Sequence, residues 1–141
     1  MSEESKAIAL VTGGNRGIGL AIAQSLQADG HHVVVTYRSG SAPAGFSAVQ
    51  MDVTSSESVD ADFAEIESQW GLPEIIVANA GITKDGLVMR MSDEDFESVI
   101  NANLTGAFRV ARRATKGLLK LKRGRLIFIG SVVGGVGAAG Q

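Results

Sequence analysis

The segment VTGGNRGIG, residues 11–19, constrains the fold more than any other part of the chain. An apolar run, Ala7–Val11, leads into it, and a stretch with helical apolar spacing, Ile18–Asp29, follows it. Gly30 then stands where a helix ends in a left-handed residue. The glycines at G-x-x-x-G-x-G spacing are Gly13, Gly17 and Gly19. We therefore expect a strand, a sharp glycine turn and a helix in direct succession.

Glycines at such a turn let the backbone bend sharply and approach a pyrophosphate, whose charge then meets the N-terminus of the helix. A Walker A phosphate loop is excluded, because Leu20 stands after the last glycine where that motif requires lysine. Glycine richness alone is a weak indication, since loops are commonly rich in glycine. The position between strand and helix favours a dinucleotide site.

Strand-like and helix-like segments alternate along the rest of the chain. The expected strands cover His31–Tyr37, Phe46–Met51, residues 74–81 and Leu126–Ile129. One helix is expected from a cap at Thr54 or Ser55 to about Trp70, with Glu57 placed for a capping box. Another helix is expected from Ser92 onward, and a long one over about Leu104–Lys122. This alternation predicts an α/β fold, a doubly wound, Rossmann-like parallel sheet with strand order 3-2-1-4-5. Ligands bind such sheets at the carboxyl ends of the strands.

Residues 1–141 are expected to form one globular domain, since 45% of the chain is hydrophobic. No apolar run reaches membrane-spanning length, and the start MSEESKAIAL lacks the basic region of a signal peptide, so no membrane association is expected. The absence of cysteine excludes disulfides and fits a cytoplasmic protein. His31 and His32 are adjacent without partners, so neither a metal site nor a Ser-His-Asp triad is expected.

Charge is unevenly distributed along the chain. A net charge of −2 argues against bulk nucleic-acid binding. All 15 acidic residues lie at or before Glu97, whereas eight of the 13 lysines and arginines lie between Arg109 and Arg125. On the last long helix the apolar residues are Ala107, Ala111, Ala114, Leu118 and Leu121, and the basic ones are Arg109, Arg112, Arg113, Lys116 and Lys120. Two interpretations stay open: a solvated helix face, or a docking surface for an acidic partner.

The end of the second expected strand, VTYRSG, carries Arg38 where an NAD site would place an acidic residue for the ribose. A guanidinium there suits a 2′-phosphate, and Arg16 in the glycine loop could add a second positive group. The alternative is that Arg38 is an ordinary loop arginine. Because Arg38 stands where an NAD site would place an acidic residue, binding of NADP is favoured over binding of NAD.

Three further polar positions follow expected strands or helices. Asp52 in MDVT either caps a turn or hydrogen-bonds an adenine amino group. Asn79 in ANAG either bridges strand ends beside a cofactor or belongs to a tight turn. Asn103 falls at a helix junction, where its side chain could cap the helix, or bend the helix to hold water. Ser131 ends the fifth strand, where its hydroxyl could cap a turn or hydrogen-bond a substrate oxygen.

The motifs TGGNRGIG, DVT, NAG, NANLTGAF and GRLIFIGSVVG, in this order, resemble the short-chain dehydrogenase/reductases. Within that family the chain is similar to the 3-oxoacyl-acyl-carrier-protein reductases of bacterial type II fatty acid synthesis, and to their actinobacterial, mycolic-acid-type branch. The similarity extends over essentially the whole chain. It implies NADPH-dependent reduction of 3-oxoacyl-acyl-carrier-protein, in an enzyme that is a homotetramer when complete.

The resemblance also implies roles for individual residues. The cofactor-binding set is Thr12, Gly13, Asn15, Arg16, Gly17, Ile18, Gly19, Arg38, Asp52, Val53, Asn79, Ala80 and Gly81. Within it, Arg38 is expected at the 2′-phosphate, Asp52 and Val53 at the adenine, and Asn79 to Gly81 at the nicotinamide ribose. Asn103 matches the catalytic asparagine that holds a water, and Ser131 matches the serine that positions the ketone oxygen. Lys122 lies near where such reductases contact the carrier protein.

The chain departs from the family pattern after Ser131. The family's acid is a tyrosine in a Y-x-x-x-K motif, and the only tyrosine here, Tyr37, lacks that context. We expect the 141 residues to be the N-terminal part of the enzyme, without its last strands, and to be inactive alone, because no group protonates the substrate oxygen. NADPH turnover with an acetoacetyl substrate would contradict this. Another short-chain alcohol or ketone oxidoreductase, or a non-catalytic dinucleotide-binding fragment, remains an open alternative.

Overall fold

The computed structural model describes residues 6–141, and the first five residues of the acidic start lie outside that range. The strands are β1 (Ile8–Val11), β2 (His32–Tyr37), β3 (Ser47–Gln50), β4 (Pro73–Ala78) and β5 (Arg125–Phe128). The helices are α1 (Gly17–Ala28), α2 (Ser56–Gln69), α3 (Asp93–Val99), α4 (Gly106–Leu121) and α5 (Val133–Val136), with a 3-10 helix η1 (Val88–Arg90) and a π-helical segment η2 (Ile100–Thr105).

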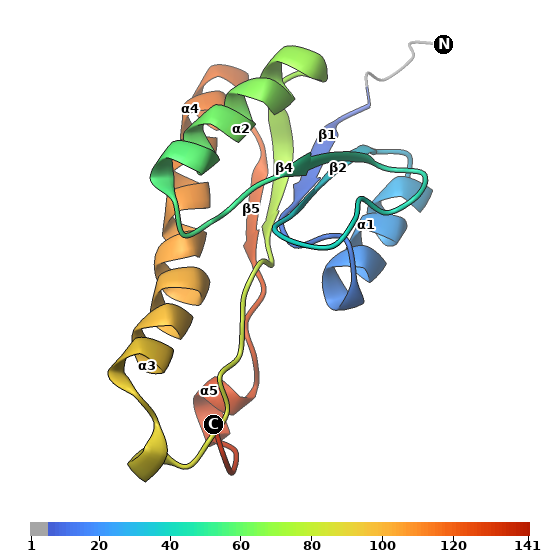
Figure 1. Ribbon diagram of the computed structural model, residues 1–141. Helices are drawn as coiled ribbons and strands as arrows, with labels where there is room; N and C mark the ends of the chain where they lie inside the picture. Colours follow the sequence, from blue (N-terminus) through green and yellow to red (C-terminus); the bar gives the residue numbers. More distant parts are fainter. Residues whose placement is uncertain (1–5) are drawn as a thin grey trace.

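The five strands form one parallel sheet in the order β3-β2-β1-β4-β5, which confirms the predicted α/β topology (Figure 1). β1 lies at the centre, with Val11 opposite Val35 of β2 and Val77 of β4. Because every strand runs in the same direction, all the carboxyl ends meet at one edge of the sheet. The chain reverses its winding direction between β1 and β4, so the switch point lies at that edge beside the glycine loop.

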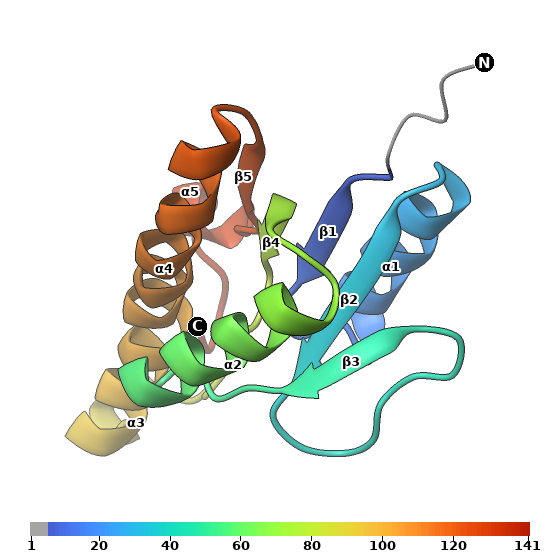
Figure 2. The ribbon, with the colours of Figure 1, turned by 90° about the horizontal axis from the view of Figure 1, so that it is seen from above.

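Helices cover both faces of the sheet, as Figure 2 shows with α1 on one side and α2 and α4 on the other. Alternate residues of the central strands therefore point into two separate cores. Leu10, Val34 and Ile76 pack with α2 and α4, where Phe63 is almost fully buried. Ala9, Val11 and Val35 pack with Ala23 of α1. The continuous apolar strands of the sequence follow from this double coverage.

The buried face of α4 only partly matches the predicted one. Of the predicted apolar set, Ala114 is buried and Ala107 and Leu118 pack partly buried against the core. The other buried residues are Gly106, Val110 and Gly117, which were not predicted. The glycines allow the close contact: a Cβ at Gly117 would lie 3.4 Å from a Leu72 methyl group. The prediction rested on apolar residues at helical spacing, and glycine does not count as apolar in such a pattern. A packing face that contains glycine is therefore missed.

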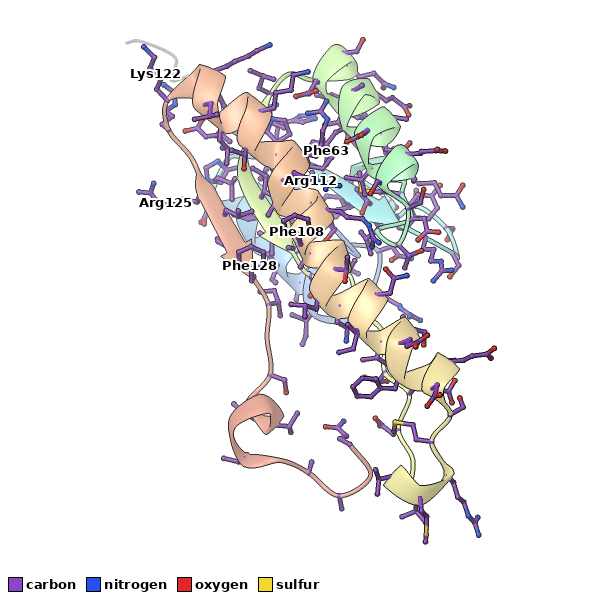
Figure 3. The ribbon with its side chains drawn as sticks, turned by 90° about the vertical axis from the view of Figure 1, so that its left-hand side faces the viewer. Phe63, Phe108, Arg112, Lys122, Arg125 and Phe128 are labelled. Atoms are coloured by element: carbon purple, nitrogen blue, oxygen red, sulfur yellow. The ribbon has the colours of Figure 1, made fainter. Side chains whose placement is uncertain are left out.

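The basic face predicted for α4 is also divided by the fold. Arg113 points inward, with its guanidinium 5.3 Å from the Phe63 ring centre and ion-paired with Glu67 of α2. Arg112 lies outside, 5.0 Å from the ring centre of Phe108 (Figure 3). The interpretation of the whole basic set as one solvated or docking face was therefore wrong for Arg113, which joins two helices.

Several local features differ from the sequence-based expectations. The cap of α2 is Ser55, one of the two expected residues, and its hydroxyl accepts a hydrogen bond from the Ser58 amide at 3.1 Å. With Ser55 as cap, however, Glu57 stands one residue short of the predicted capping-box position. The glycine-rich tail after Ser131 contains the four-residue helix α5, for which no prediction was made from the sequence. Neither η1 nor the π-helical η2 was predicted.

Candidate functional site

The glycine loop between β1 and α1 is shaped by close backbone contacts. Gly13 has a φ of +65°, a left-handed conformation that favours glycine. A Cβ at Gly19 would lie 2.2 Å from the Gly13 carbonyl oxygen, so α1 begins directly against the loop. The N-cap of α1 is Arg16, and no side chain among the described residues caps its first turn, which also contains no acid. The amides of this turn can therefore receive an anion.

Thr12 and Asn79 lock this loop to the end of β4. The Thr12 hydroxyl accepts the amides of Asn79 and Ala80 at 3.0 and 3.1 Å. In return the Asn79 side-chain amide donates to the Thr12 and Gly13 carbonyls at 3.2 and 3.1 Å. Asn79 thus bridges neighbouring strand ends, the first of its two interpretations. Thr12 is almost fully buried and acts from behind the site.

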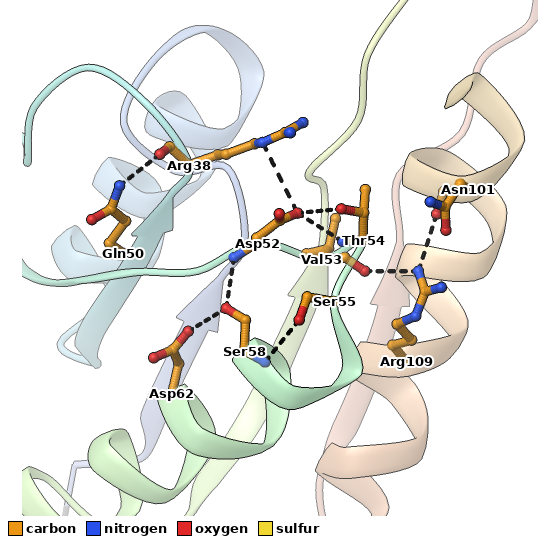
Figure 4. A network of polar contacts seen from close by, with 10 residues as sticks. All are labelled: Arg38, Gln50, Asp52, Val53, Thr54, Ser55, Ser58, Asp62, Asn101 and Arg109. Carbon is orange, nitrogen blue, oxygen red and sulfur yellow. Dashed lines mark hydrogen bonds and ion pairs between the residues drawn. The ribbon is translucent and has the colours of Figure 1, made fainter. Parts of the chain in front are cut away.

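Arg38 and Asp52 face each other at the ends of β2 and β3 (Figure 4). The Arg38 Nε lies 4.0 Å from Asp52 Oδ1, and the Arg38 side chain is 62% exposed. The Thr54 hydroxyl and amide donate to the same carboxylate oxygen at 2.6 and 2.9 Å. The hydrogen bond from the Thr54 hydroxyl is the main reason that the pKa of Asp52 lies below its ordinary value of 3.8. Burial, the second-largest effect, opposes it, and the Thr54 amide and the charges of Arg38 and Arg109 lower the pKa further.

A cavity of about 510 Å³ lies between these groups at the carboxyl edge of the sheet. Of the predicted cofactor-binding residues, it is lined by Gly13, Asn15, Arg16, Arg38, Asp52, Val53, Asn79, Ala80 and Gly81. The glycine loop, the ends of β2 and β3 and the end of β4 therefore meet around a single cavity. Asn15 closes one side, because its side-chain amide donates to the Ser39 carbonyl at 3.2 Å.

A larger, more open groove of about 1410 Å³ adjoins this cavity and continues between α4 and β5. Asn103 and Ser131 both line it, together with Ile18, so the two predicted catalytic residues share one groove. Ser131 is exposed, and its hydroxyl accepts the Val133 amide at 3.3 Å. The Ser131 hydroxyl hydrogen remains available as a donor. Phe108 and Phe128 form part of the apolar walls.

Asn103 lies in η2, and its side chain is held by the backbone of Ile82. Its Oδ1 accepts the Ile82 amide at 2.8 Å, and its Nδ2 donates to the Ile82 carbonyl at 2.9 Å. A Cβ at Gly81 would lie 2.8 Å from Asn103 Oδ1, so glycine is needed for this close approach. One amide hydrogen and one lone pair of Asn103 remain for a further partner such as water. π-Helical turns occur frequently at functional sites.

Four of the predicted residues lie outside these two spaces. Thr12, Gly17 and Gly19 line neither cavity within the described chain, and Gly19 serves to pack α1 against the loop. Lys122 ends α4 in a left-handed conformation with a φ of +57°. Lys122 precedes β5 whereas Ser131 follows it, so the two residues lie at opposite edges of the sheet.

Residues 6–141 bring no group of three histidine, cysteine, aspartate or glutamate side chains into a metal-binding arrangement. Among the helices described, none has both the length and the apolar character needed to cross a membrane.

Two residues at the site were not anticipated in these roles. Ile82 supplies the backbone groups that hold Asn103, and Arg109 donates from α4 to the Val53 carbonyl. Nothing in a single sequence indicates which backbone amide an asparagine will contact. Arg109 could have been singled out only by its spacing of three residues from Gly106, which places both on the side of α4 that faces the loop after β3.

Known proteins resemble the chain over nearly its whole length. A family model described as short chain dehydrogenase matches residues 7–141. The 3-oxoacyl-[acyl-carrier-protein] reductase MabA of Mycobacterium bovis is 58% identical over 132 residues, which cover 94% of this chain and 53% of that protein. MabA of Mycobacterium avium is 54% identical, with 94% and 52% covered. The reductase FabG of Escherichia coli is 40% identical, with 100% and 61% covered.

The chain thus spans between half and two thirds of the length of these relatives. The matched region includes the glycine loop, both cavities and Ser131. Because the family model covers every residue from Ala7 to Gln141, the chain belongs to the short chain dehydrogenase family.

Proposed function

We propose that this chain forms the cofactor-binding part of an NADPH-dependent 3-oxoacyl-acyl-carrier-protein reductase. The observation that carries the proposal is the cavity at the switch point, where Arg16 and Arg38 stand beside a glycine loop. The names of the similar proteins support the substrate class, since MabA and FabG are 3-oxoacyl-acyl-carrier-protein reductases.

The residues present fit a dinucleotide. The uncapped first turn of α1 offers backbone amides to a pyrophosphate, and Gly13, which lines the cavity, adds no side chain that would obstruct it. Gly17 has a φ of +56°, and a Cβ there would meet no atom within 4 Å, so the left-handed conformation of the loop, and not crowding, favours glycine at this position. Asp52 and Val53 would bind the adenine end, and Asn79 to Gly81 the nicotinamide ribose. Arg38 would hold the 2′-phosphate.

A reduced nicotinamide bound there supplies the hydride. In this proposal Ser131 donates its hydroxyl hydrogen to the ketone oxygen of the substrate and holds it beside the cofactor cavity. Asn103 keeps residues 81 and 82 against η2 and uses its remaining amide hydrogen or lone pair to hold a water. Protonation of the product oxygen needs a further acid, which Asn103 and Ser131 do not supply.

The partners of the reaction are also part of the proposal. An acyl-carrier-protein thioester would enter along the groove between α4 and β5. Lys122 would contact the acidic carrier protein from the opposite edge of the sheet. This contact requires that the carrier protein reach around the subunit or bind to a second subunit. The enzyme would act as a cytoplasmic homotetramer. Leu119, an apolar residue of α4 that is exposed outside the groove, supports association between subunits.

Cofactor preference tests this function most simply. We expect the chain to bind NADPH about tenfold or more tightly than NADH, because charge-assisted hydrogen bonds from Arg38 reward the 2′-phosphate. Arg38→Asp should reverse the preference, since the carboxylate repels the phosphate and can accept from a ribose hydroxyl. Fluorescence or calorimetric titration measures both affinities.

Arg90→Asp is the matched control, because it makes the same charge change in η1, outside both cavities. It should leave the preference unchanged. Equal affinities of the parent chain for NADPH and NADH would contradict the assignment of Arg38.

A further inference from the structure

Arg109 extends from α4 toward the interior of the site rather than toward solvent (Figure 4). Its Nη1 donates to the Val53 carbonyl at 3.0 Å and, more weakly, to the Asn101 carbonyl at 3.4 Å. It lines neither of the two cavities described above. The guanidinium therefore acts behind the walls of the site.

The two carbonyls that Arg109 contacts belong to different walls. Val53 lies between Asp52 and Thr54 in the loop after β3, which forms the proposed adenine end of the cavity. Asn101 belongs to η2, the turn that also carries Asn103. One side chain thus bridges the loop that would contact adenine and the turn that positions the proposed catalytic asparagine.

Close packing reinforces this bridge. A Cβ at Gly106 would lie 2.9 Å from a Val53 methyl group, so the loop rests directly on the first turn of α4. The Gly106 amide donates to the Asn101 carbonyl in the i to i+5 pattern of η2, and Arg109 is a second donor to that carbonyl. Arg109 and the packing of Gly106 on Val53 thus connect the loop after β3 with the π-helical turn.

We propose that Arg109 is a positioning residue that couples occupancy of the adenine end of the cavity to the orientation of Asn103. The proposal rests on the proposed function, in which Asn103 is catalytic. The reporter of Asn103 is the Ile82 amide, which donates to Asn103 Oδ1 at 2.8 Å. When η2 shifts, this hydrogen bond weakens and the Ile82 amide exchanges with solvent faster.

Hydrogen exchange of the full chain, followed by NMR without ligand, tests the bridge itself. We expect Arg109→Ala to speed exchange of the Ile82 amide about tenfold, the effect of losing a hydrogen bond to a charged group. The Thr12 amide, which donates to the Val77 carbonyl inside the sheet, serves as the internal reference and should not change. Arg109→Lys keeps the charge and should restore part of the protection.

Arg112→Ala is the matched control, because Arg112 lies on the same helix and instead donates to Ser56 Oγ at 3.2 Å. It should leave Ile82 exchange unchanged. Exchange of Ile82 in Arg109→Ala equal to that of the parent would overturn the proposal. If Arg109→Ala does not melt cooperatively, Arg109→Gln is measured in its place. Faster exchange of the Ile82 amide in Arg109→Gln would support the proposal, and exchange equal to that of the parent would overturn the proposal.

Adenosine 2′,5′-bisphosphate tests the coupling, since it can fill the adenine end without a nicotinamide to touch Asn103. We expect it to slow Ile82 exchange several-fold in the parent, about the effect of a modest hydrogen bond, and not in Arg109→Ala. Binding without any response at Ile82 would overturn the coupling. If the parent does not bind the compound, the proposed function fails, and the ligand-free comparison still decides whether Arg109 holds Asn103.

Discussion

At the scale of single residues, Asp52 makes the contacts of a turn cap and also lies in the cavity where the proposed function needs it. Its carboxylate accepts the Thr54 amide and hydroxyl as in a turn, and it also lines the cavity beside Arg38. The sequence could place Asp52 after a strand. It could not reveal these partners, because their positions depend on the turn between β3 and α2.

The lowered pKa of Asp52 leads to a pH-dependent prediction. Since folding favours the carboxylate, Asp52 contributes stability above its unfolded pKa, and this contribution disappears as pH falls through the lower folded pKa. Thr54→Val removes the hydroxyl donor and should raise the pKa of Asp52. The variant should therefore be less stable than the parent near neutral pH, and the difference should shrink below about pH 4.

Carboxyl NMR titration measures the pKa of Asp52, and thermal melts at several pH values measure stability. Thr115→Val is the control, because the Thr115 hydroxyl donates only to its own helix, at the Ala111 carbonyl. An unchanged Asp52 pKa in Thr54→Val would show that the hydroxyl bond does not hold the carboxylate.

At the scale of elements, regular features were predictable and exceptional ones were not. The glycine spacing and the alternation of apolar strand-like segments with helix-like segments predicted all five strands. Their order was also predictable, because right-handed crossovers leave few arrangements of a parallel sheet. The π-helical η2 was missed, since its extra residue per turn depends on tertiary contacts of Asn101 and Asn103 rather than on propensity. For the same reason Arg109 and Arg113 were assigned to a surface from which the fold removes them.

β5 is an edge strand of the described sheet, and its apolar residues predict association. Ile127, Phe128 and Ile129 are 43%, 55% and 38% exposed. Exposed apolar edge strands pair readily with other chains. We expect the 141-residue chain to associate in sedimentation velocity experiments and Phe128→Lys to reduce this association.

Leu119→Lys separates the edge strand from the outer face of α4, where Leu119 is 72% exposed. If Leu119→Lys alone disperses the chain, association takes place through α4 and the assignment to β5 is wrong. A parent chain that is monomeric and melts cooperatively would contradict association through either surface.

At the scale of the whole molecule, the two edges of the sheet differ in chemistry. The carboxyl edge gathers the glycine loop, Arg38, Asp52 and Asn79 around one cavity. The opposite edge carries exposed basic residues at the end of α4 and the start of β5, among them Lys120, Lys122 and Arg125. The central claim is that the nucleotide binds at the first edge, although phosphates could be attracted electrostatically to either.

Hydrogen–deuterium exchange of the parent chain with and without NADPH tests this claim most directly. We predict slower exchange in residues 12–19, 52–54 and 79–82, the segments that contribute residues to the cavity, and unchanged exchange in residues 120–125 at the other edge. Protection confined to residues 120–125, or no protection in the three cavity segments at saturating NADPH, would contradict the proposed nucleotide site.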